Sequence, residues 1–276
     1  MKIAVIGCGS MGLKHTKHAK ELGLEDYLCD IKSDRVEQLR NTYNIDSNNT
    51  CTNYEDLIAK NVDAVLIATD TAVHTKIAEF FSSHKIHIYS EIPVNDSSLG
   101  LKRLLSETIE NDIISMVGMV WRFHPAIKLM KDLVSKDEIG KVNTVSLYGG
   151  EYLPDWHPKE PYKKEYSAMI EKGGGVIVTN ISGIDLLRWF FGEAQFAFCV
   201  YDSISHINID AEDFFMAIIK FNNGVHAQLY SDFFQRPVEN RFEIIGEKGK
   251  IRWDHNKNKV ELFNYSESDT NNWIQY

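Results

Sequence analysis

The chain has 276 residues, of which 43% are hydrophobic and 25% are charged, and its formal net charge is −9. This length allows two domains with cores of their own, and the composition is that of an ordinary globular protein. The negative charge and the lack of a basic cluster argue against a nucleic-acid partner.

The four cysteines lie far apart in the sequence without C-x-x-C spacing, which suggests neither a zinc site nor a disulfide framework, so we expect no metal; they are Cys8, Cys29, Cys51 and Cys199. The chain begins with an apolar run of strand length rather than with the charged and apolar regions of a signal peptide. No apolar run approaches the roughly 20 residues that a membrane-spanning helix needs. We therefore expect a cytoplasmic protein without a membrane partner.

The first element in chain order is a predicted strand, residues 2–6, that leads into a glycine-rich turn. The turn reads Gly7-Cys8-Gly9-Ser10-Met11-Gly12, and good helix formers follow it. In a G-x-G-x-x-G turn the first glycine allows a tight turn, the second lets the backbone approach a pyrophosphate, and the third lets the helix pack closely. The helix N-terminus adds free N–H groups and the positive end of a dipole. The pattern predicts a dinucleotide site rather than a purely structural strand–helix turn.

Asp30 ends a second apolar run about twenty residues after the turn, where a carboxylate is expected to bind the adenine ribose hydroxyls. A 2′-phosphate there would meet a like charge at a cost of roughly 1 to 4 kcal/mol. Lys32 is the only cation close by in sequence, so the pattern favours NAD over NADP. The alternative is that Asp30 serves as an acid at the next helix N-terminus, a role that Ser33 or Asp34 could also fill.

Strands and helices alternate with short connections up to residue 118, which predicts βαβ units and a parallel sheet. The predicted helices cover residues 33–43, a short segment opened by a capping box at 53–56, 75–83 and 99–109; the strands cover 62–69, 86–90 and 113–118. Ligands of such sheets bind at the carboxyl ends of the strands. We therefore expect cofactor contacts from Thr69, Asp70, Thr71, His74, Glu91, Ile92 and Pro93. A helix-cap or surface role is the alternative for His74.

The second half changes to a period of two, which predicts an antiparallel or mixed sheet with one or two helices. A crossover at 118–125 precedes a helix to about residue 134, a strand from 142, an aromatic loop over 151–172 and an apolar helix over 176–191. The later strands are 197–201, 213–221, 225–233, 241–246 and 249–254, with hairpin turns at 222–224 and 247–248. We predict an α/β protein with a Rossmann domain over 1–120 and a second α/β domain over 121–276.

Several stretches taken together resemble the Gfo/Idh/MocA oxidoreductases. They are residues 6–12, residues 69–74 (similar to T-P-x-x-x-H), Glu91-Ile92-Pro93 in place of E-K-P, and residues 122–125, 150–158, 173–175, 185–192 and 246–249. The resemblance implies a Rossmann doubly wound parallel sheet followed by an α/β domain with a large open, mostly antiparallel sheet. It also implies a nicotinamide cofactor, a sugar, polyol or nucleotide-sugar substrate, and homodimers or homotetramers formed through that sheet.

Three positions depart from the family pattern. The lysine of E-K-P falls on Ile92, and the family's aspartate and histidine after G-G-G fall on Thr179 and Ser182. Hydroxyl groups can orient a substrate but do not hold a proton near neutral pH. General acid–base catalysis is typically worth 10²–10⁴-fold, roughly 3 to 5 kcal/mol of barrier. The chain also stops soon after its second hairpin, where the family usually continues.

Two hypotheses follow from these departures. The first is an active oxidoreductase whose acid/base has moved to the aromatic loop, as His157 or Tyr166. The expected substrate pocket then comprises Trp156, Tyr162, Lys163, Lys164, Thr179 and Ser182. Arg122 is expected to touch nicotinamide or substrate, with a salt bridge at the domain junction as its alternative. The second hypothesis is a catalytically silent homologue that binds NAD and serves as a ligand-binding or regulatory protein.

Overall fold

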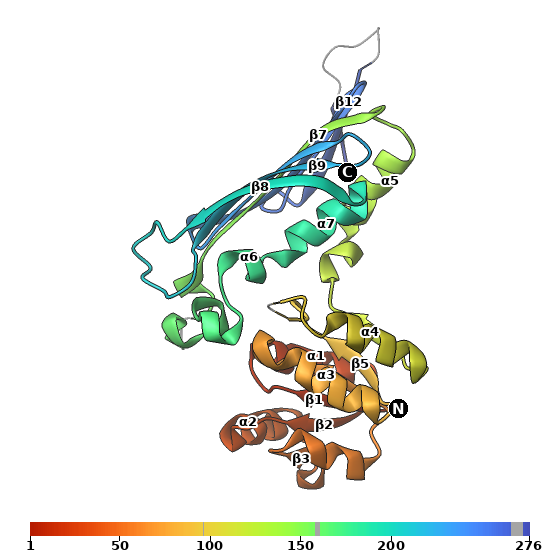
Figure 1. Ribbon diagram of the computed structural model, residues 1–276, viewed down its shortest axis with the longest axis vertical. Helices are drawn as coiled ribbons and strands as arrows, with labels where there is room; N and C mark the ends of the chain where they lie inside the picture. The colour runs from red at the N-terminus through yellow and green to blue at the C-terminus, as the bar shows by residue number, and fades with distance from the viewer. Residues whose placement is uncertain (96, 158–160, 266–272) are drawn as a thin grey trace. The chain divides into compact units, whose positions relative to one another are not determined.

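The computed structural model describes residues 1–95, 97–157, 161–265 and 273–276. These residues form two compact units (Figure 1). The first unit comprises residues 1–118 and 171–173, and the second comprises 119–170 and 174–276. No helix of the described residues combines the length and the apolar character that crossing a membrane requires.

A six-stranded parallel sheet forms the centre of the first unit, in the order β3-β2-β1-β4-β5-β6. Its strands are β1 (Lys2–Ile6), β2 (Glu25–Cys29), β3 (Thr50–Cys51), β4 (Ala64–Ile67), β5 (His87–Ser90) and β6 (Ser115–Val117). The order reverses between β1 and β4, which is the switch point where dinucleotides bind in Rossmann sheets. The predicted parallel sheet is confirmed; β3, at its edge, is too short to show in the sequence pattern.

Both faces of this sheet are covered, which explains the nearly continuous apolar strands. Ala4 and Ile6 of β1 enter one core with Phe81, whereas Val5 points into the other with Leu39. The covering helices are α1 (Ser10–Glu21), α2 (Ser33–Tyr43), α3 (His74–Ser83) and α4 (Leu101–Glu110). Three short 3-10 segments complete the unit: η1 (Ser47–Asn49), η2 (Tyr54–Lys60) and η3 (Thr71–Val73).

The second unit contains an eight-stranded sheet in the order β14-β13-β12-β11-β7-β10-β9-β8. Its strands are β7 (Val142–Tyr152), β8 (Ala194–Asp202), β9 (Phe214–Phe221), β10 (His226–Asp232), β11 (Phe234–Gly246), β12 (Gly249–Asp254), β13 (Lys259–Asn264) and β14 (Trp273–Gln275). β7 and β10 pair in parallel, and the other neighbours pair in antiparallel fashion. The mostly antiparallel sheet is confirmed.

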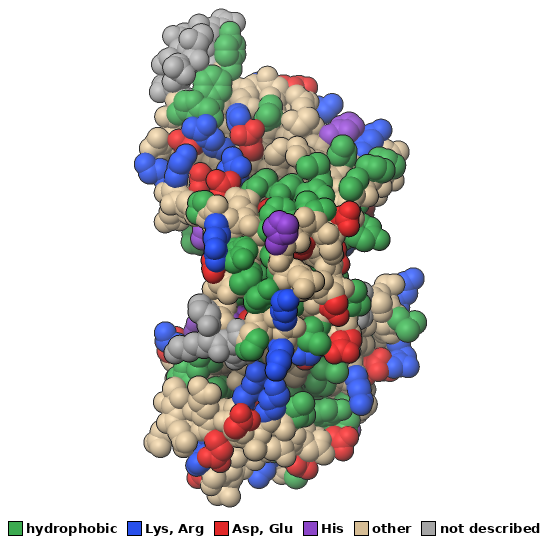
Figure 2. All heavy atoms as spheres, turned by 90° about the vertical axis from the view of Figure 1, so that its left-hand side faces the viewer, with side chains coloured by type: hydrophobic (Ala, Val, Ile, Leu, Met, Phe, Trp, Pro, Cys, Tyr) green, Lys and Arg blue, Asp and Glu red, His purple; other side chains and the backbone are tan. Residues whose placement is uncertain are grey.

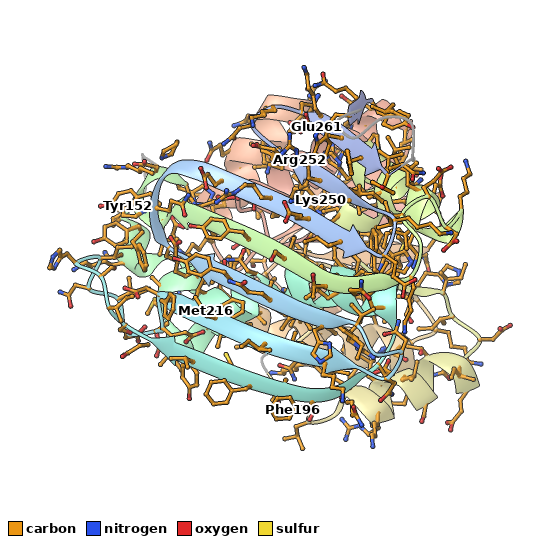
Figure 3. All side chains as sticks on the ribbon, turned by 90° about the horizontal axis from the view of Figure 1, so that it is seen from above. Tyr152, Phe196, Met216, Lys250, Arg252 and Glu261 are labelled. Carbon is orange, nitrogen blue, oxygen red and sulfur yellow. The ribbon has the colours of Figure 1, made fainter. Side chains whose placement is uncertain are left out.

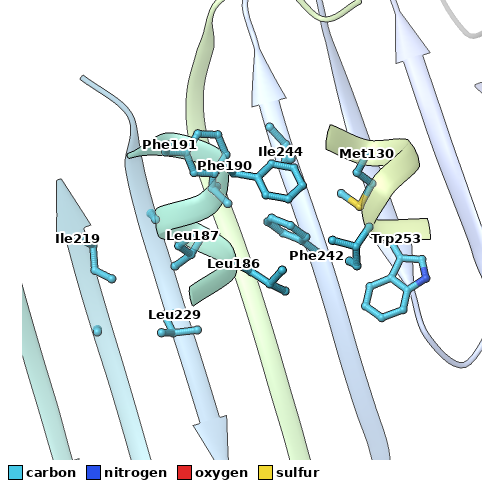
Figure 4. Close-up of a cluster of buried hydrophobic side chains, with 14 of the residues drawn as sticks. Met130, Leu186, Leu187, Phe190, Phe191, Ile219, Leu229, Phe242, Ile244 and Trp253 are labelled. Atoms are coloured by element: carbon cyan, nitrogen blue, oxygen red, sulfur yellow. The ribbon is translucent and has the colours of Figure 1, made fainter. Parts of the chain in front are cut away.

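Helices cover one face of this sheet and leave the other open (Figure 1). They are α5 (Pro125–Ser135), α6 (Val176–Thr179) and α7 (Ile181–Phe191), preceded by the 3-10 segment η4 (Val120–Phe123). Figure 4 shows α5 and α7 packing on the strands through Met130, Leu187 and Phe190. Phe242 of β11 is fully buried, and its ring lies 5.1 Å from that of Phe190.

The open face carries the alternate residues of the same strands, as Figure 3 shows for Phe196, Met216 and Lys250. Its β8–β9 side is apolar, because Phe198, Val200, Met216 and Ile218 are all exposed there. On the face of the molecule drawn in Figure 2, acidic and basic side chains are interspersed with hydrophobic ones.

Three predictions about the second unit are wrong in detail. The helix expected over 176–191 is broken at Asn180, which lies between α6 and α7 and donates from its side chain to Ser231 Oγ at 2.6 Å. The loop expected over 151–172 begins only after Tyr152, and it contains the 3-10 segments η5 (Leu153–Asp155), η6 (Tyr162–Lys164), η7 (Tyr166–Ala168) and η8 (Ile170–Lys172). β11 starts at Phe234 rather than 241, and the sheet continues into β13 and β14, whose charged and edge positions hide the strand pattern.

Candidate cofactor and substrate sites

The glycine turn between β1 and α1 has no room for side chains at two of its positions. Gly7 has a φ of +97°, and a Cβ there would lie 2.4 Å from the Ala68 carbonyl oxygen. A Cβ on Gly12 would lie 1.9 Å from the Gly7 oxygen. Both contacts are with backbone atoms, so only glycine allows this strand, this turn and this helix to meet.

Gly9 lies differently, because its Cβ position opens to space. The nearest atom to that position is Nη1 of Arg35, at 3.6 Å. Gly9 is also the N-cap of α1 and has no side chain to accept the first helical N–H groups. Backbone N–H groups, the helix N-terminus and a nearby guanidinium are the groups that bind a pyrophosphate. The turn therefore fits a dinucleotide.

Asp30 connects this turn to α2. Its Oδ2 accepts the Cys8 N–H at 2.7 Å, and its Oδ1 accepts the Lys32 N–H at 2.8 Å, just before α2 begins. A carboxylate has about four lone-pair sites, so both oxygens can still accept from ribose hydroxyls. Asp30 thus contacts the start of α2, which the sequence analysis kept as an alternative, and it also lies beside the glycine turn.

Arg35 was not among the predicted site residues, because Lys32 was expected to be the only cation close to Asp30. That prediction is wrong, because Arg35 in the first turn of α2 places its guanidinium beside Gly9. The sequence alone does not reveal this contact, because it depends on how the helix over 33–43 packs against the glycine turn. Arg35 adds positive charge where the phosphates of a dinucleotide are expected.

Residues 69–74 and 91–93 lie at the carboxyl ends of β4 and β5. His74 is fully buried, and its Nδ1 and Nε2 lie 2.8 Å from the Pro93 carbonyl and 2.9 Å from the Thr69 carbonyl. The ring lies between the two turns, and the nitrogen that carries the proton donates to one of these two carbonyls. Thr71 is buried at the start of η3, and Asp70 is exposed before it.

Glu91 is buried at the end of β5 and pairs with a residue of α1. Its Oε1 lies 2.5 Å from Nε2 of His15, and the His15 ring also packs edge-on against Tyr89 at 5.5 Å. Ile92 follows with a partly exposed apolar side chain, and Pro93 is buried. His15 was not among the predicted site residues, although its position five residues into the helix places it on the sheet-facing side.

In the second unit Arg122 of η4 forms an ion pair with Asp185 of α7. Its Nε and Nη2 donate to the two carboxylate oxygens at 2.8 and 2.5 Å, and the guanidinium lies 5.7 Å from the Trp189 ring centre. Such a bidentate pair holds the guanidinium in one orientation. The alternative expected for Arg122 was a salt bridge at the domain junction, whereas both partners of this pair belong to the second unit. Contact with a cofactor or substrate stays a prediction.

A partly open cavity of about 100 Å³ lies between the helices and the sheet of the second unit. Its polar side chains come from β7, β10, β11 and α7 and from the break between α6 and α7. They are Glu151, Ser231, Asn240, Ser182 and Asn180, respectively. Two indole rings, Trp121 and Trp253, lie 5.5 Å apart on the same lining. A mainly apolar pocket with a few convergent polar groups is typical of small-molecule sites.

Glu151 is half-buried at the end of β7 and is the only carboxylate among the described residues of this lining. Burial raises the pKa of its carboxyl, and a hydrogen bond with the Asn240 side chain and the charge of His255 oppose that rise. From the sequence, Glu151 was expected only at the start of the aromatic loop. The period of two through Val145, Leu147 and Gly149 would have placed it on the helix-covered face.

Two family models match the chain, one in each half. Residues 1–119 match the model described as "Oxidoreductase family, NAD-binding Rossmann fold", and residues 127–252 match the "GFO/IDH/MocA C-terminal domain". The chain belongs to the Gfo/Idh/MocA oxidoreductase family. The predicted resemblance is thereby confirmed.

Relatives of this family member include the myo-inositol 2-dehydrogenase of Thermotoga maritima, which is 25% identical over 269 residues, 92% of this chain and 75% of that protein. A levoglucosan dehydrogenase solved with NADH and levoglucosan has a TM-score of 0.86 at 19% identity and covers all of this chain and 80% of its own. The WlbA dehydrogenase of Bordetella pertussis, solved with NADH and UDP-GlcNAcA, has a TM-score of 0.82 at 20% identity, covering 92% and 73%. At these identities the solved structures show the fold.

The three residues that replace the family's ionisable groups lie in different surroundings. Ser182 lines the cavity, whereas the hydroxyl of Thr179 is buried without a hydrogen-bond partner among the described residues. Ile92 lies in the first unit beside Glu91. None of these three side chains can take a proton near neutral pH, as the sequence indicated.

The loop residues proposed as acid/base or pocket residues lie outside the cavity lining. His157 Nδ1 lies 2.9 Å from the Glu165 carboxylate, and the Tyr162 hydroxyl donates to the Ile207 carbonyl at 2.8 Å. Trp156 packs edge-on against Phe233 at 5.5 Å. Tyr166 is half-buried, and Lys163 and Lys164 are exposed. Their catalytic and substrate-binding roles stay predictions. Within the described ranges no group of three metal-ligating side chains comes together.

Proposed function

We propose that this protein is an NAD-dependent oxidoreductase of sugars or polyols. The observation that carries the proposal is the arrangement of Gly9, Arg35 and Asp30 in the first unit, which we call the cradle. The Cβ direction of Gly9 points into open space beside Arg35, and Asp30 accepts a hydrogen bond from the Cys8 N–H. Bound nicotinamide would supply the acceptor for a hydride from a substrate carbon. Family membership and the dehydrogenase names of the relatives support the reaction class. The experiment is titration with NAD followed by NADH formation on a panel of polyols.

Asp30 is expected to select NAD over NADP through its negative charge. Replacing Asp30 with alanine should weaken NAD binding about 10-fold or more, because one charge-assisted hydrogen bond is lost. The same replacement should reduce or reverse the preference of the protein for NAD over NADP. Calorimetric titration with both cofactors measures the ratio.

Asp34, an exposed acid in the first turn of α2, provides the matched control. Asp34→Ala should leave both cofactor affinities unchanged. If Asp30→Ala lowers the melting temperature but keeps the NAD/NADP ratio, Asp30 acts only on the start of α2.

The catalytically silent alternative is favoured by the replacement of all three family ionisable groups, at Ile92, Thr179 and Ser182. It predicts NAD binding with normal affinity and no NADH formed from any sugar or polyol tested. The oxidoreductase proposal predicts binding and turnover together, so the same pair of measurements separates the two functions.

The protein is further expected to form dimers or tetramers through the open face of its eight-stranded sheet. The β8–β9 side exposes a contiguous apolar strip in which Ile218 is 53% exposed. Ile218→Glu should convert the assembly to the 31.6 kDa monomer in light scattering, because a buried interface cannot hold an unpaired carboxylate. Asn222→Glu, in the exposed hairpin turn, should leave the assembly intact. A wild-type protein that is already monomeric would contradict this expectation.

A further inference from the structure

Two cysteines that lie far apart in the sequence become direct neighbours in the parallel sheet of the first unit. Cys29 is the last residue of β2 and Cys51 is the last residue of β3, and their Cα atoms are partners in the ladder that joins these strands. Neighbouring strands lie about 4.7–4.9 Å apart, which falls within the roughly 4.4–6.8 Å that separate the Cα atoms of a disulfide. The backbone therefore already has the spacing that a bond between these residues requires.

The side chains of the pair also meet. Cys29 belongs to the core cluster that contains Phe81, and Cys51 packs against the same cluster. A hydrogen bond joins the two thiols. Because both the Cα atoms and the side chains are neighbours, a disulfide needs no large rearrangement of the strands.

The two thiols differ in their access to solvent and in their affinity for a proton. Cys29 is 2% exposed, whereas Cys51 is partly exposed on β3, the edge strand of the sheet (Figure 1). The hydrogen bond from the Cys29 thiol lowers the pKa of Cys51 and outweighs burial; the same bond, together with burial, raises the pKa of Cys29. The thiolate is the nucleophile in thiol oxidation. An oxidant therefore reacts first with Cys51, and Cys29 resolves the product.

The pair adjoins the cradle. Asp30 follows Cys29 directly, and its N–H donates to the Cys51 carbonyl at 3.4 Å. The Cys29 carbonyl accepts from the Gly7 N–H at 2.8 Å and from Cys8 Sγ at 3.7 Å. A disulfide draws its two sulfur atoms to about 2.05 Å, closer than a hydrogen bond between thiols leaves them. These backbone contacts pass the resulting movement of Cys29 to Asp30 and to the glycine turn.

We propose that Cys29 and Cys51 form a reversible disulfide when the protein meets a hydroperoxide, and that the disulfide form binds NAD more weakly than the dithiol form. The effect on NAD rests on the proposed function, whereas the disulfide itself does not. Reversible disulfides of this kind serve as redox sensors in reducing compartments.

The reaction balances with hydrogen peroxide as the oxidant. The Cys51 thiolate attacks one peroxide oxygen, the O–O bond breaks, and the second oxygen leaves as water after it takes up a proton. The Cys29 sulfur then attacks the sulfur of the Cys51 sulfenic acid; the S–S bond forms, the S–O bond breaks, and the hydroxyl leaves as water with the Cys29 proton. Two thiols are thereby oxidised while one peroxide is reduced to water. A dithiol reductant reverses the change by thiol–disulfide exchange.

The other two cysteines provide contrasts. Burial, followed by the charge of Asp30, raises the pKa of Cys8 to about 12, so this thiol stays protonated and unreactive. Cys199 is exposed on β8 of the second unit and has no part in the pair.

Peptide mapping of the wild-type chain tests the disulfide. The full chain is treated with hydrogen peroxide, alkylated and digested with trypsin, which cuts between the two cysteines at Lys32 and Arg40. A linked pair of peptides that contain Cys29 and Cys51 should appear after peroxide and disappear after dithiothreitol. Absence of this pair, or a link from either residue to Cys8 instead, would overturn the disulfide.

Calorimetric titration tests the effect on NAD. Peroxide should weaken NAD binding by wild type about 10-fold or more, and dithiothreitol should restore it. Cys51→Ser should bind NAD within about 3-fold of reduced wild type and should not respond to peroxide. Cys51→Ala repeats this test without placing a hydroxyl group against the core.

Cys199→Ser is the matched control and should keep the full peroxide response, because it keeps the pair. A response that persists without Cys51, or one that is lost without Cys199, would show that another residue is responsible and would overturn the proposal.

The outcomes separate this inference from the proposed function. If the linked peptides form and NAD affinity stays within about 3-fold, the effect on NAD is overturned and the disulfide stands. If the reduced wild type does not bind NAD, the proposed function fails and the effect on NAD fails with it. The peptide map then still supports or overturns the disulfide by itself.

Discussion

Replacing Gly9 with valine is expected to weaken NAD binding at least about 100-fold while the free protein keeps its stability. The reason is that Gly9 is the one glycine of the turn whose Cβ direction is open, with Arg35 Nη1 as its nearest atom at 3.6 Å. Its φ of −78° is accessible to any residue. A side chain there fills the space into which the pyrophosphate would fit. Calorimetric NAD titration and thermal unfolding measure the two effects separately.

Gly12 provides the contrasting variant in the same turn. Gly12→Ala places a Cβ 1.9 Å from the Gly7 carbonyl oxygen, so α1 has to move away from β1. Thermal unfolding should show a large loss of stability in this variant even without cofactor. If Gly9→Val unfolds the free protein as Gly12→Ala does, or if it binds NAD normally, then the cradle is not the cofactor site.

Phe242→Ala should have the largest effect on the second unit and destabilise the protein by about 3–5 kcal/mol, the cost of a cavity in place of a buried phenylalanine. Phe242 is fully buried, and its ring packs against Phe190 of α7 (Figure 4). This contact joins β11, which carries Asn240, to the helix that carries Ser182. We therefore expect polyol binding to weaken together with stability.

Urea unfolding measures the free energy of unfolding of this variant. Val238→Ala, on the same strand but 40% exposed, is the matched control and should cost no more than about 0.5 kcal/mol. Equal losses in the two variants would mean that the helices do not stabilise the sheet as described. NAD affinity should be unaffected in both, because the glycine turn belongs to the other unit.

The cofactor half could be predicted from sequence because its determinants are local. The spacing of Gly7, Gly9 and Gly12 follows from backbone contacts within a dozen residues, and the apolar strands follow from a sheet covered on both faces. Arg35 escaped notice because its approach to Gly9 depends on where α2 packs. The position of the buried His74, whose ring faces the Pro93 carbonyl nineteen residues along the chain, likewise depends on tertiary contacts.

The substrate half was less predictable because its cavity collects residues from distant strands. Glu151, Asn180 and Asn240 lie far apart in the chain and meet only once β7, β11 and the break between α6 and α7 are in place. The acid/base residues predicted from the sequence, His157 and Tyr166, therefore belong to the aromatic loop. Ser182 is the one predicted pocket residue that lines the cavity, and it was found by counting back from Asp185.

We propose that this chain binds NAD and uses it to oxidise a polyol. The most direct measurement is the formation of NADH when the purified protein is mixed with NAD and a panel of neutral polyols, with NAD binding followed by calorimetry on the same sample. We expect each chain to bind NAD and to form NADH with at least one polyol. Failure to bind NAD would contradict it outright, and binding without turnover on any substrate would leave the catalytically silent homologue as the protein's function.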